Sequence, residues 1–285
     1  MRLTSELEPK VAEGLERLAE KTVGELPRAG GYDPAFFDQL TQVEDRHFWF
    51  RARNRLIFEL ARGLGASLMT CNRILEVGCG TGNVLRVLER ACPQSLVVGM
   101  ELWSDGLRHA RHRSGAALVQ ADIRNLPFGG LFGLVGMFDV LEHIPDDRET
   151  LAAVWKSLAP GGRLLLTVPA HQSLWSYFDE AAHHCRRYSQ QDIREKLRAA
   201  NFQIEFLSQF MACIFPMVWI YRKMRDLRGH GGAVGARSET RDEFRIVPVV
   251  NPILTMLLTL EAAWVGRGGR LPMGTSLVVV ARKPA

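Results

Sequence analysis

The sequence of 285 residues predicts an α/β protein with a doubly wound, mostly parallel sheet. Two observations carry this prediction. From residue 73 onward, short apolar runs alternate with segments in which apolar residues recur at helical spacing. A glycine-rich turn, residues 78–82, directly follows the first apolar run. Strands separated by single helices require right-handed crossovers, and these place the strands parallel and cover both faces of the sheet.

The strands expected in the first part are the apolar runs 74–77, 96–100, 117–120, 134–138 and 163–168. The helices expected among them cover 83–91, 103–113 and 148–158, and a Pro-Gly-Gly turn at 160–162 precedes the fifth strand. In the last third, residues 190–200 are expected to be helical, and residues 202–207 and 275–282 to be strands. The core domain is therefore expected over residues 64–210 plus 274–285.

A helical extension, residues 1–63, is expected ahead of this core. Residues 4–20 carry Leu and Val at helical spacing, residues 25–32 contain the Pro and Gly residues of a linker, and residues 33–62 are helical again. An aromatic cluster at 47–50 is followed by Arg51 and Arg53. The cluster either packs in the core or forms a lid over a bound ligand, whose carboxylate one of the two arginines would then meet.

A second helical segment, residues 211–273, is expected as an insertion between the last two strands, although a hairpin turn needs only a few residues. Two apolar stretches, 206–221 and 247–265, flank a basic patch, and prolines interrupt both, so neither is expected to span a bilayer. The patch consists of Arg222, Lys223, Arg225 and Arg228. The insertion is either an extra helical layer or a hydrophobic cover that touches a membrane, with its arginines facing anionic headgroups.

The composition excludes several classes of protein. A hydrophobic share of 47% and a charged share of 24% are those of ordinary globular chains. The five cysteines form no CxxC pair, which argues against a disulfide framework or a structural zinc site, and no metal site is expected. The net charge of +5 is scattered rather than gathered into a stripe, so no nucleic-acid partner is expected. The N-terminus lacks the apolar run of a signal peptide, which predicts a cytoplasmic protein.

Acidic residues mark the ends of the first three expected strands. Glu101 follows Gly82 by 19 residues, where a carboxylate can accept both hydroxyls of a ribose, and Asp122 can accept from an adenine amine. A dinucleotide site has similar spacing. Here, however, the second and third glycines are separated by one residue, whereas the dinucleotide motif has two. Glu76 would also repel a pyrophosphate. The acid instead favours a ligand that carries an ammonium and a sulfonium group.

Several motifs together resemble those of class I S-adenosylmethionine-dependent methyltransferases, with the small-molecule type that includes the ubiquinone-pathway O-methyltransferases as the most similar subgroup. They are ILEVGCGTG at 74–82, Glu101, Asp122, FDVLEHI at 138–144 and LAPGGRL at 158–164. The resemblance covers about residues 73–210 and the final strand. It implies a Rossmann-like methyltransferase fold of seven strands whose last two form an antiparallel hairpin.

The resemblance also implies contacts to S-adenosylmethionine as the cofactor. On the methionine side we expect Glu76, Gly78, Cys79, Gly80 and Gly82; at the ribose, Glu101; at the adenine, Leu102, Asp122 and Ile123; near the transferring methyl, Phe138 and Asp139; and at the carboxylate, Arg51. Positioning and desolvation would supply most of the catalysis.

A general base is needed only if the acceptor arrives protonated. His143, His183 and His184 are the candidates, of which we select His143 and His184 as catalytic residues, although the motif around His143 also has a structural interpretation. The run 184–188 resembles a subgroup pattern, His-x-Arg-Arg-Tyr. It is either a loop anchored by a helix cap at Ser189 or a wall of the acceptor site that includes His184.

The function expected from these residues is transfer of a methyl group to an O or N nucleophile of a small or lipid-linked acceptor. Two alternatives stay open: a protein that binds the same cofactor in a sensory or non-methylating role, and a membrane-surface interaction module on the same fold. If the insertion touches a membrane, the protein is expected at its inner face. The oligomeric state is not predicted.

Overall fold

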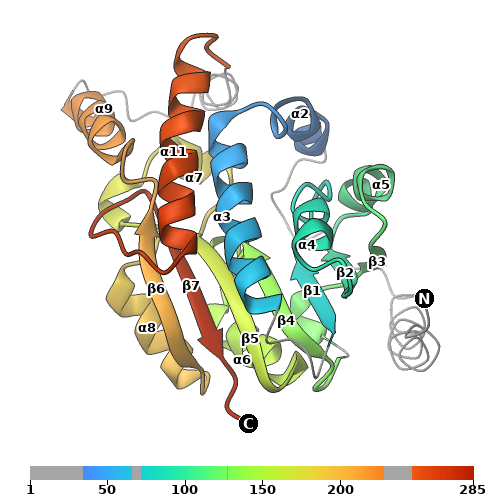
Figure 1. The fold of residues 1–285 in the computed structure, drawn as a ribbon. Coiled ribbons are helices and arrows are strands. Elements are labelled where there is room, and N and C mark those ends of the chain that lie inside the picture. The colour runs from blue at the N-terminus through green and yellow to red at the C-terminus, as the bar shows by residue number, and fades with distance from the viewer. Residues whose placement is uncertain (1–34, 66–71, 127, 228–245) are drawn as a thin grey trace.

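The sheet has seven strands in the order β3-β2-β1-β4-β5-β7-β6, as the computed structural model shows (Figure 1). The structure describes residues 35–65, 72–126, 128–227 and 246–285. The parallel strands are β1 (Arg73–Val77), β2 (Leu96–Glu101), β3 (Ala117–Gln120), β4 (Phe132–Phe138) and β5 (Leu158–Pro169). Strand β7 (Ser276–Arg282) lies between β5 and β6 (Gln203–Phe210) and runs antiparallel to both. The predicted doubly wound sheet with an antiparallel final pair is confirmed.

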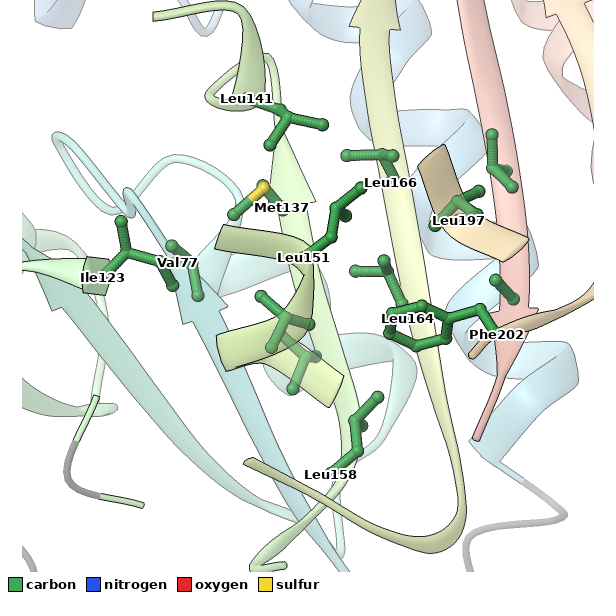
Figure 2. Packing of buried hydrophobic residues seen from close by; sticks show 14 of the residues in the cluster. Val77, Ile123, Met137, Leu141, Leu151, Leu158, Leu164, Leu166, Leu197 and Phe202 are labelled. Carbon is green, nitrogen blue, oxygen red and sulfur yellow. The ribbon is translucent and has the colours of Figure 1, made fainter. Parts of the chain in front are cut away.

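Helices cover both faces of the sheet because successive strand residues point to opposite sides. One face carries α3 (Phe48–Gly65), α4 (Leu85–Ala91), α5 (Ser104–Arg113) and α11 (Val250–Gly266). The other carries α6 (Asp147–Ser157) and α8 (Gln190–Ala199). Figure 2 shows Leu151 of α6 and Leu197 of α8 among the strand residues Met137, Leu164 and Leu166. Two apolar layers therefore fix the sheet from both sides.

The segment before β1, which the sequence predicts to be helical over 33–62, contains two helices. It consists of α2 (Ala35–Val43) and α3, joined by a turn. Glu44 in this turn is buried, accepts a hydrogen bond from Thr81 Oγ1 at 2.6 Å and pairs with Arg113 of α5. These bonds hold the turn between α2 and α3 against the glycine-rich loop. The helix expected over 4–20 and its linker lie outside the described residues.

Strand β5 is longer than expected, because the predicted Pro-Gly-Gly turn belongs to it. Leu158 is paired with Phe132, yet Arg163 is already paired with Leu134, so residues 159–162 bulge out of the ladder. Gly161 takes the left-handed conformation, with φ +77°, that such a bulge requires. The Pro-Gly-Gly sequence therefore marks an irregular backbone, as predicted, but it forms a bulge within β5 and not a turn before the strand.

Between β6 and β7 the chain forms α9 (Phe215–Leu227) and α11. Helix α11 runs along α3: Phe48 N donates to Asn251 Oδ1 at 2.8 Å near their beginnings, and a Cβ on Gly266 would collide with Glu59 near their ends. The two helices are therefore parallel neighbours (Figure 1). None of the helices in the described residues is long and apolar enough to cross a bilayer.

Short elements complete the chain at the ends of the strands. They are η1 (Ile123–Asn125), η2 (Leu141–His143), η3 (Gln172–Leu174) and α7 (Tyr177–Ala181). Ser176 and Asp179 form a capping box at the start of α7, and the Ser189 side chain caps α8. These caps fix the chain that follows β5, which borders the site described next.

Candidate active site

A cavity of about 590 Å³ lies at the carboxyl ends of β1, β2 and β4. The sheet order reverses between β1 and β4, and open α/β sheets bind ligands at this switch point. Helices α2 and α3 contribute Phe37, Phe50 and Arg53 to its wall, and the loop after α7 contributes His183 and Cys185. The N-terminal helices and the loops after the strands thus enclose one site.

The glycine-rich turn brings the backbone to the edge of this cavity. Gly78, Cys79 and Gly80 line it, and the N–H groups of Gly78 and Cys79 donate to Met100 O. Gly82 does not line it. Its φ is +78°, and a Cβ there would lie 2.8 Å from Ala110 Cα, so this glycine permits close packing of the turn on α5. The four predicted contacts in the turn thus separate into ligand-facing and packing positions.

Glu76 is the charged group best suited to a cationic ligand. Its side chain is buried, and its Oε2 atom finds no hydrogen-bond partner among the described residues. Burial raises the pKa of Glu76 well above its ordinary value, the nearby Arg53 opposes this, and Glu101 adds to it. A buried carboxylate without its full set of partners fits an ammonium group, and S-adenosylmethionine carries one beside its sulfonium.

Glu101 organises the backbone around the site as well as facing it. It accepts hydrogen bonds from Gly80 N at 2.9 Å, Leu102 N at 2.7 Å and Trp103 N at 3.1 Å. Burial raises the pKa of Glu101, and these three bonds lower it in part. The remaining acceptor capacity of its two oxygens fits ribose hydroxyls. The same carboxylate also joins the glycine-rich turn to the start of α5.

Leu102, Asp122 and Ile123 line the far side of the cavity, where the adenine was expected. The Asp122 carboxylate accepts from Arg124 N at 2.9 Å and from the Arg124 guanidinium. Burial would raise the pKa of Asp122, but these bonds outweigh it and hold the pKa below the ordinary value. Asp122 is therefore ionised, and Arg124 is a wall residue that sequence reasoning did not select.

Arg53, and not Arg51, reaches the cavity. Arg53 Nη1 lies 2.9 Å from Asp139 Oδ2, and the guanidinium lies over the rings of Trp49 and Phe50, at 4.8 Å and 5.5 Å from their centroids. Arg51 is exposed and lines a separate cavity on the outer side of α3. The phase of the helix decides between the two arginines. The aromatic cluster both packs and, through Phe50, walls the site.

Asp139 and Phe138 form the floor expected from the sequence. Asp139 has φ +55°, a conformation uncommon for a residue with a Cβ, and its N–H donates to Thr167 O at 3.0 Å. This turn at the end of β4 aims the carboxylate at Arg53.

His143 lines the cavity beside this floor, and its ring contacts that of His184 edge-on, with 4.7 Å between centroids. Burial, followed by the neighbouring His184, lowers the pKa of His143 to about 3, so its imidazole is neutral at pH 7. His184 does not itself line the cavity, and its Nδ1 lies 2.9 Å from Asp179 Oδ1. The two predicted catalytic histidines are thus adjacent, with His143 in front and His184 held from behind.

Asp179 anchors the loop that carries these residues. It is fully buried, bonds Arg187 Nε at 2.7 Å, and accepts from Ser176 N at 2.8 Å. Burial would raise the pKa of Asp179, but His184 and Arg187 outweigh it and lower the pKa to about 2. In the same loop Arg186 bonds Pro145 O and Tyr188 bonds Asp147. The arginines and the tyrosine of the 184–188 run therefore hold the loop in place.

Glu142, which was not selected from the sequence, lies behind the two histidines. One ligand atom from each of Glu142, His143 and His184 falls within 4.8 Å of the others, a spacing that one cation could bridge. Burial and the neighbouring Asp139 raise the pKa of Glu142 well above its ordinary value. The sequence predicted no metal ligand, because these three residues come from two loops.

A doubly wound sheet with an acid-lined cavity at its switch point defines an α/β protein that binds a nucleoside-type cofactor. A family model described as "Methyltransferase domain" matches residues 7–206, and the chain belongs to this family. The chain therefore contains a methyltransferase domain, and its sequence motifs predict S-adenosylmethionine as the cofactor of that domain.

Curated relatives support the family over part of the chain. The trans-aconitate 2-methyltransferases of Deinococcus radiodurans and Azoarcus sp. are 32% identical over 113 residues and 30% identical over 115 residues. These matches cover 39% and 40% of this chain, and 41% and 43% of those proteins. The chain therefore spans about two fifths of the length of the curated relatives it matches.

Solved structures share the fold. A chain of the Haloferax volcanii complex between the Trm112 methyltransferase activator and a methyltransferase has a TM-score of 0.55 at 17% identity, with 88% of this chain and 95% of that chain covered. A SAM-dependent methyltransferase from Thermotoga maritima has a TM-score of 0.52 at 15% identity, with 88% and 97% covered.

Proposed function

We propose that this methyltransferase acts on an O or N nucleophile of a small or lipid-linked acceptor that enters beside His143. The observation that carries the proposal is the position of His143, which lines the same cavity as the cofactor residues Glu76, Glu101 and Asp139. His183 and Cys185 border the same part of the wall. An acceptor there would meet a neutral imidazole, which can accept a proton or a hydrogen bond.

The residues that would contact the cofactor form three groups, one for each part of the cofactor. Glu76 would meet the ammonium group, Glu101 the ribose hydroxyls, and Asp122 with Leu102 and Ile123 the adenine. S-adenosylmethionine supplies an electrophilic methyl group when bound. The protein positions the two reactants and excludes water, and alignment of this kind contributes on the order of 7–11 kcal/mol.

His143 would serve as the proton acceptor and His184 as the residue that positions it. His184 is held through Nδ1 by buried Asp179, and its edge contact with His143 limits the rotation of that ring. With its pKa lowered to about 3, His143 is a weak base. It can take the acceptor's proton only once the forming bond to the methyl group has made that proton more acidic. An acceptor that is acidic or already ionised therefore suits this site.

An apolar acceptor suits this cavity better than a polyanionic one. Curated relatives are named for trans-aconitate, a carboxylate acceptor. In this chain the two cavity arginines are already paired, Arg53 with Asp139 and Arg124 with Asp122. Apolar side chains at the same wall, among them Phe37, Phe50 and Ile144, favour a lipid-linked or otherwise hydrophobic acceptor, supplied from a membrane that the protein contacts peripherally.

Two measurements test the proposal. S-adenosylhomocysteine should bind in titration calorimetry, and NADH should not. Labelled S-adenosylmethionine should then transfer its methyl to hydrophobic phenols, acids or amines presented in detergent. A chain that binds the cofactor product but methylates nothing in this panel would support the alternative sensory role.

A further inference from the structure

Helix α11 buries three polar side chains beside apolar ones, and it exposes a row of large apolar side chains. The buried side includes Asn251, Thr255 and Glu261. Asn251 bonds Phe48 N and Arg46 O, and Glu261 accepts from the backbone N–H groups of residues 212 and 213 at 3.0 and 3.2 Å. These bonds fix the rotation of the helix about its axis. The apolar stripe on its other side is therefore turned outward by specific interactions.

The outward stripe covers most of the length of α11. It consists of Ile253, Met256, Leu257, Leu260 and Trp264, which recur at helical spacing, and Leu260 is 64% exposed. Helix α9 adds Met217, Trp219, Ile220, Tyr221 and Met224, also exposed. Of the large apolar side chains that are exposed in the described ranges, only Leu96 lies outside residues 217–273. A patch of this kind marks an interaction surface.

An arginine-lined cavity opens beside this stripe. It has a volume of about 590 Å³ and is bordered by Arg51 and Arg55 of α3, Arg86 and Arg90 of α4, and Thr259 of α11. Two acids, Glu44 and Asp45, also line it, and they pair with Arg113 and Arg86. Thr259 lies on the flank of α11 between its buried side and its outward stripe. The cavity is therefore at the border of the apolar surface and not at the cofactor site.

The arginines of this cavity are incompletely paired. Arg55 pairs with Glu59 at 2.5 Å, and Arg86 pairs with Asp45. The Nε atom of Arg86 is buried without a hydrogen-bond partner in the described part of the chain. No ion pair to another described residue is found for Arg51 or Arg90. A buried guanidinium N–H without a partner and two unpaired charges suit a phosphate group.

We infer that the outward face of α11 and α9 docks on an anionic phospholipid bilayer, with a lipid phosphate in the cavity of Arg51, Arg55, Arg86 and Arg90. Apolar side chains with Trp and Tyr among them suit the acyl and headgroup boundary, and arginines at their border suit its phosphates. This charge arrangement favours the bilayer over a second copy of the chain, whose same face would bring like charges together. The inference deepens the proposed function, since it names the surface from which a hydrophobic acceptor would be taken.

Among the residues of the basic patch predicted from the sequence, Arg222 does not face this surface. Arg222 is turned inward, with Nη1 3.9 Å from Asp179 Oδ2, while Lys223 is exposed. The side chain of Arg225, and Arg228 as a whole, lie outside the described residues. The headgroup contacts are thus assigned to α3 and α4, which sequence reasoning did not connect with a membrane.

Sedimentation with vesicles tests the surface on the full chain. Wild type should bind phosphatidylcholine vesicles that contain phosphatidylglycerol more tightly than pure phosphatidylcholine vesicles. Leu260→Gln should weaken binding to both by about tenfold or more, and Leu96→Gln, the matched apolar control, should not. Arg90→Glu should weaken binding to the anionic vesicles alone by about thirtyfold. Arg111→Glu, an exposed arginine of α5 away from the cavity, should have little effect.

Three results would overturn the inference. Wild type could stay in solution with both kinds of vesicle; Arg90→Glu and Arg111→Glu could weaken binding equally; or Leu260→Gln could convert a dimer to a monomer in light scattering, which would assign the face to a second copy. Calorimetry with S-adenosylhomocysteine, without vesicles, separates this inference from the proposed function. Loss of vesicle binding with intact product binding rejects the surface only, and the reverse rejects the cofactor assignment only.

Discussion

Arg53 Nη1 lies 2.9 Å from Asp139 Oδ2, so a side chain of the N-terminal helix α3 bonds the end of the central strand β4. Both side chains are largely buried, at 11% and 17% exposure. The pair joins helix α3 to the floor of the cavity at the ends of β1, β2 and β4. It also places a positive charge close to Glu76, whose pKa it lowers against the larger effect of burial.

Arg53→Met should therefore destabilise the protein and weaken S-adenosylhomocysteine binding. Breaking a buried pair leaves Asp139 without its partner, at a cost of about 3–5 kcal/mol, less whatever water replaces. Arg51→Met is the matched control, since Arg51 is exposed and outside this cavity, and should change stability by only about 0.5 kcal/mol. Thermal melts and calorimetry of both variants measure this. If Arg51→Met weakened product binding more, the sequence-based assignment of Arg51 would stand instead.

Glu101→Ala should weaken cofactor binding by about 1.5–3 kcal/mol, the range for charge-assisted hydrogen bonds. It should also lower the melting temperature of the ligand-free protein, because Gly80, Leu102 and Trp103 lose their acceptor. From the sequence alone, the acid serves only the ligand. Asp105→Ala, in the first turn of α5 and paired with Arg108, is the control in both measurements. A melting temperature unchanged by Glu101→Ala would contradict the structural role.

Glu76→Gln should stabilise the ligand-free protein and weaken its binding of S-adenosylhomocysteine. The folded pKa of Glu76 is raised, so the unfolded chain ionises more readily and stability falls as pH rises above the ordinary carboxyl pKa. The amide removes that penalty, and the ligand-free variant should melt higher than wild type at pH 7. Binding of S-adenosylhomocysteine should nevertheless weaken by about 1.5–3 kcal/mol, because the ammonium loses its counter-ion. A variant that melts lower and binds normally would show that Glu76 has a structural partner.

His143→Asn should lower the methyl-transfer rate by about 10²-fold or more while leaving S-adenosylhomocysteine binding nearly unchanged. A rate close to wild type would indicate an acceptor that needs no base.

The same variant should change the pH dependence of stability. The folded pKa of His143 is depressed to about 3, so its contribution is fully present above the unfolded pKa near 6.5 and is lost as pH falls toward 3. Wild type should accordingly lose more stability than His143→Asn between pH 7 and pH 4.5. His112→Asn, at an exposed position of α5, serves as the control. If stability fell equally with pH in wild type and in His143→Asn, the His143 side chain would be exposed to solvent and not buried.

The sequence alone determined the sheet, the glycine-rich turn and the acids at the strand ends. Each of these is a local pattern: the alternation of apolar runs fixes strands and helices, and Glu101 and Asp122 reach the ligand edge because parallel strands end there. Figure 1 shows the resulting order of elements. The predicted contacts at Glu76, Gly80 and Asp139 line the cavity for the same reason.

Only the tertiary structure decided which neighbour in a helix faces the site and which side of α11 faces outward. Arg51 and Arg53 differ by two residues in sequence, but the axial rotation of α3, set by its packing on α4 and α11, brings only Arg53 to Asp139. Asn251 and Glu261 likewise fix the rotation of α11, so that Leu260 is exposed while Leu258 of the same helix is buried. Helix rotation depends on bonds between residues up to about 200 positions apart, such as Phe48 and Asn251, and no local periodicity contains that information.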